Sequence, residues 1–377
     1  MKICVLGTGL VGSAISMDLA KENKFEVTAV DYNENQFAKL ANHAEIAKKV
    51  ADLSTSEGVK NFVKDFDFVI NALPSDMGFN TTKAVIEAGR NVIDISFFEE
   101  DPFQLSELAK EMNVTAIVDC GIAPGMSNIL TGYLVNILDK TSKIRIYVGG
   151  IPEKKVLPWE YKAGFAPEDV INEYVRPARF VENGEIVTRP ALTEPELIEF
   201  GEAGMLEAFN TDGLRSLIYT IKVPDMKEQT LRYKGHIEKI QLLKDSGFFS
   251  EEEIMINGSK IRPIDFTSKI LFPHWEMKNG VKDLTVFKVE ATGVKNDKSV
   301  RYTYDMIDKY DEVSNIHSMA RTTGYTAAVV TRMVSEGVFS TKGLIVPEEI
   351  GKDTKCVEYI LNAMRERGID FQLKIAI

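Results

Sequence analysis

The chain has 377 residues, 44% of them hydrophobic, and carries 45 Lys plus Arg against 56 Asp plus Glu, so its formal net charge is −11. This length is expected to give two domains, or one elaborated domain, with a large core, and it excludes a lone small module. The acidic balance lacks the positive field that nucleic acid and anionic membranes require. A small-molecule partner is therefore expected, with no nucleic acid and no membrane.

The three cysteines are Cys4, Cys120 and Cys356. Their odd number and wide spacing argue against a disulfide framework and against a zinc site, and indicate a reducing compartment. No apolar run approaches the roughly 18 residues of a membrane span. Met1 leads into a glycine-interrupted segment instead of the apolar core of a signal peptide. We expect a cytoplasmic protein whose site needs no metal.

The first 120 residues alternate short β-branched runs with helical patterns, an order that predicts parallel strands joined by crossover helices. Strands are predicted over Lys2–Leu6, Glu26–Val30, Glu45–Val50, Phe68–Ala72, Asn91–Ile95 and Thr115–Val118. Their nearly continuous apolar character is typical of a sheet that is covered on both faces. The predicted fold class is therefore α/β, with a Rossmann-type doubly wound parallel sheet.

A glycine-rich turn follows the first predicted strand and opens a predicted helix. It reads Gly7-Thr8-Gly9-Leu10-Val11-Gly12, the G-x-G-x-x-G pattern of dinucleotide-binding turns. In that pattern the first glycine permits the tight turn, the second lets a pyrophosphate approach the backbone, and the third allows close packing of helix on strand. The N-terminus of the helix then offers unpaired N–H groups to the phosphates. The alternative is a glycine-rich turn without a ligand.

An acidic residue accompanies this turn. Asp31 ends the second predicted strand, 19 residues after Gly12, where a carboxylate accepts hydrogen bonds from the adenosine ribose. It would repel a 2′-phosphate, and Tyr32 and Asn33 follow it instead of an arginine. We therefore predict NAD as the cofactor, in preference to NADP.

Further candidates lie at the carboxyl ends of strands, where cofactors bind in open α/β sheets. Asp52 follows the third predicted strand and either caps the next helix or hydrogen-bonds adenine. Leu73 and Pro74 follow the fourth strand and are expected to shape the nicotinamide side of the site.

Beyond Asp119 the pattern changes to that of a second, α+β domain with a mixed sheet. A helix is predicted near Met126–Leu138, and the alternation over Lys143–Gly149 predicts a strand. Asn183-Gly184 and Asn257-Gly258 are hairpin-turn dipeptides. A later hairpin is predicted from Leu284–Glu290 and Ser299–Asp305. The exposed edges of such a sheet favour a homodimer formed by sheet extension.

The C-terminal part is predicted to contain a long helix over His317–Glu336 that ends at Gly337. The helix Asp353–Arg367 and the strand Phe371–Ile377 have no separate core and are expected to dock onto an existing domain. The predicted domains are thus residues 1–128, completed by residues of about 317–377, for NAD binding. Residues 129–316 form the domain for substrate binding and dimerisation.

Several longer blocks carry a resemblance to a known family. Residues 118–130 contain Gly-Ile-Ala-Pro-Gly-Met-Ser-Asn-Ile-Leu, and residues 235–239 read Gly-His-Ile-Glu-Lys. Further matching blocks are residues 147–152, 207–209, 211–217, 232–234 and 319–325. In these blocks the chain resembles the saccharopine dehydrogenase-like family, and within it the lysine 6-dehydrogenases.

The resemblance implies NAD-dependent oxidation of the ε-amino carbon of L-lysine. The product would be 2-aminoadipate 6-semialdehyde, which cyclises to piperideine-6-carboxylate, and ammonia would be released. Relatives act instead on saccharopine or carboxynorspermidine, which remain alternatives. An alternative of another class is a non-catalytic NAD-binding sensor or scaffold.

Amine oxidation requires a base, because the nitrogen must be neutral when the hydride leaves the adjacent carbon. His236 lies among charged residues in a matching block, and a near-neutral pKa would suit it to this role. Asp119, just past the last parallel strand, is the second acid–base candidate, or a group that binds ammonium. Each has a structural alternative: His236 could satisfy backbone hydrogen-bonding groups, and Asp119 could cap a helix.

Other residues are candidates for holding an amino-acid substrate. A guanidinium can grip a carboxylate with two hydrogen bonds, and the candidates are Arg215, Arg232 and Arg321. Thr211 and Asp212 precede the first of these on one predicted loop, where Asp212 could bind an ammonium group. Tyr174 is expected either to line the pocket or to pack in the core. Each arginine has the alternative of a structural ion pair.

Overall fold

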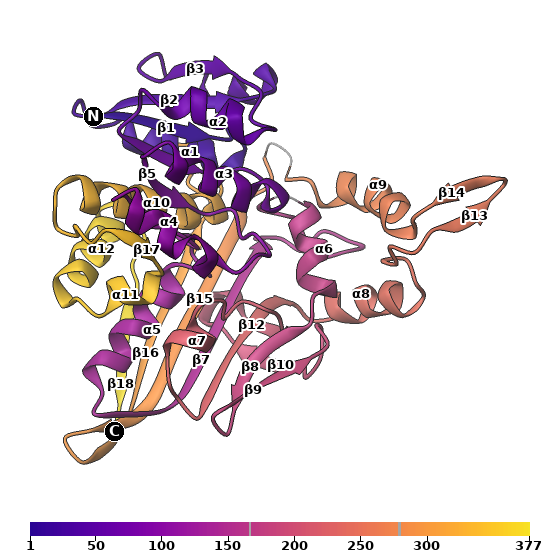
Figure 1. Cartoon of the computed structure of the whole chain (residues 1–377). Coiled ribbons are helices and arrows are strands. Elements are labelled where there is room, and N and C mark those ends of the chain that lie inside the picture. Colours follow the sequence, from indigo (N-terminus) through magenta and orange to yellow (C-terminus); the bar gives the residue numbers. More distant parts are fainter. Residues whose placement is uncertain (166, 278–279) are drawn as a thin grey trace. The chain divides into compact units, whose positions relative to one another are not determined.

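The computed structural model describes residues 1–165, 167–277 and 280–377. Figure 1 shows the whole chain, coloured along its sequence. The chain divides into two compact units. The first unit consists of residues Met1–Leu138 and Ala320–Phe371, and the second of residues Asp139–Met319 and Gln372–Ile377.

The described part of the first unit contains a seven-stranded sheet in the order β17-β6-β5-β4-β1-β2-β3, in which all neighbours are parallel. The strands are β1 (Lys2–Leu6), β2 (Glu26–Asp31), β3 (Ala47–Val50), β4 (Phe68–Asn71), β5 (Asn91–Asp94), β6 (Thr115–Ile117) and β17 (Gly343–Ile345). The six strands predicted from the N-terminal sequence are confirmed to within two residues. The strand order reverses at β1, which lies between β4 and β2 and so marks the switch point at which ligands bind in such sheets.

Helices cover both faces of this sheet. They are α1 (Leu10–Leu19), η1 (Glu34–Leu40), α2 (Ser56–Val63), α3 (Ser75–Glu87), η2 (Pro102–Leu105), α4 (Ser106–Glu111), α5 (Met126–Ile137), α10 (Ser318–Ser335), α11 (Pro347–Gly351) and α12 (Thr354–Glu366). Val59, Val85 and Ala109 of α2, α3 and α4 pack in one buried cluster with Leu6 of β1. On α10, Gly324 lies so close to α1 that an added Cβ would be 3.1 Å from Ile15. The doubly wound α/β prediction is confirmed.

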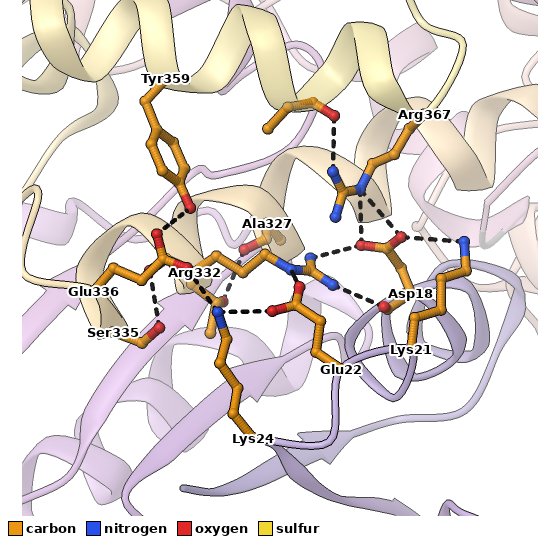
Figure 2. Close-up of polar contacts among 12 residues, drawn as sticks. Asp18, Lys21, Glu22, Lys24, Ala327, Arg332, Ser335, Glu336, Tyr359 and Arg367 are labelled. Atoms are coloured by element: carbon orange, nitrogen blue, oxygen red, sulfur yellow. Dashed lines mark hydrogen bonds and ion pairs between the residues drawn. The ribbon is translucent and has the colours of Figure 1, made fainter.

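An ion-pair network centred on the buried Asp18 joins α1 to the C-terminal part of the first unit (Figure 2). Asp18 of α1 accepts hydrogen bonds from Arg332 Nη1 at 2.6 Å and from Arg367 Nε at 3.0 Å. Glu22 also pairs with Arg332, and Lys24 joins Glu22 to Glu336. This network ties the helix that follows the glycine-rich turn to segments more than 300 residues away in sequence.

The described residues of the second unit form a nine-stranded mixed sheet. Its main order is β10-β11-β12-β7-β15-β16-β18, and β8 pairs with β12 and β9. The strands are β7 (Lys140–Pro152), β8 (Ala178–Glu182), β9 (Glu185–Arg189), β10 (Glu196–Glu199), β11 (Met205–Asn210), β12 (Asp225–Tyr233), β15 (Asp283–Lys295), β16 (Lys298–Lys309) and β18 (Gln372–Ala376). The β12–β7 pair is parallel and the others are antiparallel, which confirms the predicted α+β class.

Both Asn-Gly dipeptides lie in hairpins, as predicted. Asn183 and Gly184 join β8 to β9, and Asn257 and Gly258 join β13 (Ile254–Ile256) to β14 (Ser259–Ile261); all four residues have positive φ. The β13–β14 hairpin projects away from the long strands of the second unit in Figure 1. The helical segments of this unit are α6 (Pro167–Val175), η3 (Gly201–Ala203), α7 (Leu217–Thr220), α8 (His236–Asp245) and α9 (Pro263–Trp275).

The C-terminal segment is shared between the two units. Helix α12 belongs to the first unit, but β18 pairs with β16 in the second. The sequence had assigned residues 317–377 as a whole to the first domain. Pairing explains the difference, because the backbone groups along the edge of β16 gain hydrogen-bond partners from β18.

Candidate functional site

The glycine-rich turn has the geometry that a bound pyrophosphate requires. Gly7 has φ +89°, and a Cβ there would lie 2.6 Å from the carbonyl oxygen of Ala72. A Cβ at Gly12 would lie 1.9 Å from the carbonyl oxygen of Gly7. At Gly9, in contrast, a Cβ would meet nothing within 4 Å among the described residues, so the space above the turn is open. Two glycines are thus required by close packing, and one leaves room for a ligand.

Helix α1 begins directly after this open position. Gly9 is its N-cap and supplies no side-chain cap, and Leu10 and Val11 are half-buried in the first turn. The first amides of a helix have no partner within it, and together with the helix dipole they favour an anion. The described residues therefore fit the phosphates of a dinucleotide.

Asp31 ends β2 beside the turn and is 7% exposed. Its Oδ2 accepts hydrogen bonds from the amide and the hydroxyl of Thr8, both at 2.9 Å, and its Oδ1 accepts one from the Asn33 amide at 3.0 Å. A carboxylate has about four lone-pair positions, so acceptor capacity remains for ribose hydroxyls. These bonds fix the carboxylate against the turn that would hold the phosphates.

Of the other cofactor candidates, two lie beside the turn and one does not. A Cβ at Gly7 would be 3.3 Å from Cδ2 of Leu73, so this side chain borders the turn, and Pro74 is the exposed N-cap of α3. Asp52 is exposed and accepts a hydrogen bond from the Ser54 amide at 2.9 Å. The interpretation of Asp52 as a helix cap is wrong, because Thr55 caps α2.

Polar side chains meet at the ends of β4 and β5. Asp94, fully buried, accepts hydrogen bonds from Asn71 Nδ2 at 2.7 Å and from Thr82 Oγ1 at 2.8 Å, and Ser96 also donates to it. Burial raises the pKa of Asp94 to about 7, although the hydrogen bonds from Thr82 and Ser96 oppose the rise. Sequence reasoning missed Asp94, although it has the same signal as Asp31, an acid at the end of a parallel strand.

Asp119 follows β6 in the same unit and is 1% exposed, with a left-handed φ of 52°. Its charge contributes to the raised pKa of Asp94. The Cys120 amide donates to the Asp94 carbonyl at 2.8 Å, so the backbone after Asp119 is held against β5. At the start of α5, Asn128 Oδ1 accepts the amide hydrogen of Gly125 at 3.3 Å. The Gly125 amide at the start of α5 therefore already has a hydrogen-bond acceptor within the chain.

His236 begins α8 in the second unit and is fully buried. Its Nδ1 lies 2.8 Å from the carbonyl oxygen of Trp159, and its Nε2 lies 2.9 Å from the Tyr174 hydroxyl. A carbonyl only accepts, so Nδ1 carries the hydrogen, and Tyr174 donates to Nε2. Burial, reinforced by the positive charge of Arg232, lowers the pKa of His236 to about 3. The expected near-neutral pKa is therefore wrong, and this neutral ring orients Tyr174.

Arg232 lies in the same region and is 2% exposed. Its Nη2 donates to Glu173 at 3.1 Å and its Nη1 donates to the Leu231 carbonyl at 3.0 Å. Its guanidinium lies 4.5 Å from the centre of the Tyr161 ring. Two of its nitrogens thus donate hydrogen bonds within the chain. This is the arrangement expected of a structural ion pair, the alternative role of Arg232.

Thr211 contacts Glu228, a buried acid that the sequence analysis did not identify. Its hydroxyl donates to Glu228 Oε2 at 2.7 Å and lies 2.9 Å from the Thr230 hydroxyl. Asp212 next to it forms an ion pair with Arg179, with contacts of 3.0 Å to Nε and 2.8 Å to Nη2. The charge of Asp212 is therefore balanced by a cation of the chain.

The remaining arginine candidates lie in different units. Arg215 belongs to the second unit, is 7% exposed and has a left-handed φ of 54°. Arg321 lies on α10 in the first unit and donates to the carbonyl of Arg367 at 2.7 Å. The structure thus gathers Tyr174, Thr211, Arg215, Arg232 and His236 in the second unit, and places Asp119 and Arg321 with the glycine-rich turn in the first.

Within residues 1–165, 167–277 and 280–377, no group of three or more His, Cys, Asp or Glu side chains is arranged to hold a metal ion. No helix within them combines the length and apolar character that crossing a bilayer requires.

Family models match both parts of the chain. The saccharopine dehydrogenase NADP binding domain matches residues 3–117, and the saccharopine dehydrogenase C-terminal domain matches residues 121–369.

Curated relatives include the mitochondrial alpha-aminoadipic semialdehyde synthase of Mus musculus, 21% identical over 92% of this chain and 45% of that protein. The chain therefore spans less than half the length of that relative. Saccharopine dehydrogenase [NADP(+), L-glutamate-forming] of Schizosaccharomyces pombe is 21% identical over 99% of this chain and 98% of its own length. Carboxyaminopropylagmatine dehydrogenase of Synechocystis is 23% identical, with 93% of each chain covered.

Solved structures share the fold. The apo saccharopine dehydrogenase (L-Glu forming) of Saccharomyces cerevisiae has a TM-score of 0.81 at 18% identity, with all of both chains covered. A homospermidine synthase of Legionella pneumophila, solved in complex with NAD, has a TM-score of 0.70 at 13% identity and covers 100% of this chain and 91% of its own.

Proposed function

The chain belongs to the saccharopine dehydrogenase family, and from this premise we propose that it catalyses the NAD-dependent oxidative deamination of the ε-amino group of L-lysine. The products are 2-aminoadipate 6-semialdehyde, which cyclises to piperideine-6-carboxylate, and ammonia. The observation that supports a dinucleotide reaction is the open helix start at Gly9 beside the carboxylate of Asp31. The choice of lysine comes from the blocks at residues 118–130 and 235–239.

In this proposal the turn from Gly7 to Gly12 would hold the pyrophosphate, Asp31 the ribose and Asp52 the adenine. Leu73 and Pro74 would border the nicotinamide. Bound NAD supplies the acceptor for the hydride.

On the substrate side, an arginine, either Arg215, Arg232 or Arg321, holds the α-carboxylate. Tyr174, Thr211 and Asp212 line the amino-acid site. Asp119 takes part in proton transfer. The amine must lose a proton before its lone pair can form the C=N bond, so a base of the chain acts first.

The test is a substrate panel. Purified protein is incubated with NAD and, separately, L-lysine, L-ornithine, saccharopine or carboxynorspermidine, and NADH and ammonia are both measured. Turnover of L-lysine with one ammonia per NADH supports the proposal. Turnover of saccharopine or carboxynorspermidine alone, without ammonia, would replace the substrate. NAD binding without any turnover would favour the non-catalytic sensor.

Saccharopine dehydrogenation is the second candidate, because relatives that match nearly the full chain carry that name. NADP is likewise the second cofactor candidate, since the matching domain model is named for it. The side chain of Lys39 also favours NADP. Lys39 of η1 lies close enough for its charge to interact with that of Asp31, and burial lowers the pKa of Lys39. If Asp31 holds the ribose, a cation at Lys39 would lie near the 2′-position and would favour a 2′-phosphate.

We propose in addition that the protein is a cytoplasmic homodimer formed by sheet extension. In the part of the chain that the structure describes, β18 pairs on one side only, with β16, and Leu373 and Ile375 on it are 43% and 54% exposed. A second copy would pair with this open edge. Light scattering should give twice the chain mass, and Ile375→Pro should give monomers; a monomeric wild type would contradict this arrangement.

A further inference from the structure

The second unit contains a buried carboxyl group that no cation among the described residues balances. Glu228 lies in the middle of β12 and is 4% exposed. Its Oε2 accepts hydrogen bonds from the Thr211 hydroxyl at 2.7 Å and from the Gly213 amide at 3.1 Å. Across the described ranges, no Lys, Arg or His lies within ion-pair distance of either oxygen, and Oε1 has no hydrogen-bond donor.

The other acids around Glu228 are already paired. Asp212, on the loop that precedes Arg215, is bound by Arg179, and Glu173 of α6 is bound by Arg232. Arg232 lies four residues along β12 and so on the same face as Glu228, but it donates hydrogen bonds to Glu173 and to a backbone carbonyl. Glu228 is thus the member of this group whose charge has no counterion.

The surroundings also hold the carboxyl group in one position. A Cβ at Gly213 would lie 2.4 Å from both Cδ and Oε2 of Glu228, so only glycine allows the loop to approach the carboxyl this closely. Thr230 supports the arrangement from the same strand through its contact of 2.9 Å with Thr211. Oε2 is therefore held by two neutral donors, whereas Oε1 accepts no hydrogen bond from the described residues.

Such a carboxyl group is suited to exchange a proton near neutral pH. Burial, reinforced by the negative charges of Glu173 and Asp212, raises the pKa of Glu228 to about 8, while the hydrogen bonds from Thr211 and Gly213 oppose the rise. His236, by contrast, has a pKa lowered to about 3, and both of its ring nitrogens are engaged. A general base works best when its pKa lies near the operating pH.

We propose that Glu228 binds the protonated amino group of the substrate and accepts its proton before hydride transfer. This inference rests on the proposed function and names the base for it. An N–H bond of the ammonium breaks, its proton forms an O–H bond with Oε1, and the electron pair stays on nitrogen as the lone pair that forms the C=N bond. The ligand class is a primary or secondary ammonium.

The first test compares wild type with Glu228→Gln, which keeps the shape and can still accept from Thr211 and Gly213. Initial rates of NADH formation with L-lysine are measured from pH 6 to pH 10, in the range where a carboxyl of this kind titrates. We expect kcat/KM of the variant to fall by about 10²–10⁴-fold, and the rise of wild-type kcat/KM with pH toward about 8 to disappear. Affinity for NAD should stay the same.

Glu290→Gln is the matched control. Glu290 lies on β15 of the same sheet, and its side chain is 25% exposed at 3.8 Å from Arg301. This variant should retain wild-type rates and pH profile. Gly213→Ala provides a second perturbation of the proposed base, because the added methyl group would displace the Glu228 carboxyl, and it should lower kcat/KM with little change in NAD affinity. Glu228→Gln with wild-type kcat/KM and an unchanged pH profile would overturn the assignment.

A binding measurement separates failure of this inference from failure of the proposed function. Each amine of the panel is titrated calorimetrically into protein at pH 7 in two buffers of different ionisation enthalpy. A carboxyl group that is protonated at pH 7 must lose its proton to bind an ammonium, so wild type should release close to one proton and Glu228→Gln none. Proton release without turnover would reject the deamination but keep the ammonium site. Equal release by both proteins, or no binding of any amine, would reject the site.

Discussion

Two buried carboxyl groups, one in each unit, show how the same side chain chemistry serves different purposes. Asp18 is 1% exposed and Glu228 is 4% exposed. Asp18 receives hydrogen bonds from the guanidinium groups of Arg332 and Arg367 (Figure 2), whereas Glu228 receives them from a hydroxyl and an amide. The counterion of Asp18 is part of the fold, and that of Glu228 is absent from the described chain. Burial alone therefore does not distinguish a structural acid from a reactive one; the partner does.

The largest expected effect is on the pH dependence of stability. Burial raises the pKa of Glu228 from 4.5 to about 8, so the folded state keeps a proton that the unfolded state loses in this range. The free energy of unfolding of wild type, relative to Glu228→Gln, should then fall by about 1.4 kcal/mol per pH unit. The fall should begin near pH 4.5 and end near pH 8. Urea titrations at several pH values measure this difference, and a constant difference would contradict it.

Removing the carboxylate of Asp18 should destabilise the fold at every pH near neutrality. Asp18→Ala leaves Arg332 buried with Glu22 as its remaining carboxylate partner and deprives Arg367 of its ion pair. Loss of one partner from a buried ion pair costs about 3 kcal/mol or more. The midpoint of urea unfolding should fall accordingly. An unchanged midpoint would show that the network in Figure 2 contributes no stability.

A third carboxylate, Asp31, sharpens the comparison because its hydrogen bonds also come from neutral donors. Asp31→Ala should weaken NAD binding about tenfold, the loss of roughly 1.4 kcal/mol of hydrogen bonding to a charged acceptor. NADP binding should not weaken, because repulsion of the 2′-phosphate is lost as well. Glu26→Ala, at the exposed start of the same strand, is the control. An unchanged NAD/NADP ratio would reject the ribose assignment.

The smallest effect is expected at the edge of the Asp18 network. Lys21 Nζ lies 3.4 Å from Asp18 Oδ1, but the Lys21 side chain is 64% exposed. Exposed ion pairs contribute about 0–1 kcal/mol. Lys21→Ala should therefore shift the unfolding free energy by less than about 1 kcal/mol, measured beside Asp18→Ala. A loss as large as that of Asp18→Ala would show that proximity, and not burial of the cation, decides the contribution.

Predictability also differs between the two units. The glycine-rich turn and Asp31 lie within one strand–helix–strand unit, so spacing along the chain indicates that they meet. Glu228 is brought to Thr211 by pairing of β11 with β12, across 17 residues. His236 was selected by its charged neighbours in sequence, and the charges of Arg232 and Lys239 do act on it, but burial together with these charges lowers its pKa to about 3. Burial depends on tertiary packing, which spacing along the chain does not give.

The sequence by itself determined the parallel strands of the first unit, the mixed sheet of the second and the dinucleotide-type turn, because these depend on hydrophobic period and local turn chemistry. Only the tertiary structure decided that Asp18 meets arginines from α10 and the segment after α12, that β18 joins the second sheet, and that Glu228 has no counterion among the described residues. The same holds for the lowered pKa of His236 and the raised pKa of Glu228. Ionisation depends on desolvation and on charges brought together in space, and neither follows from the order of residues along the chain.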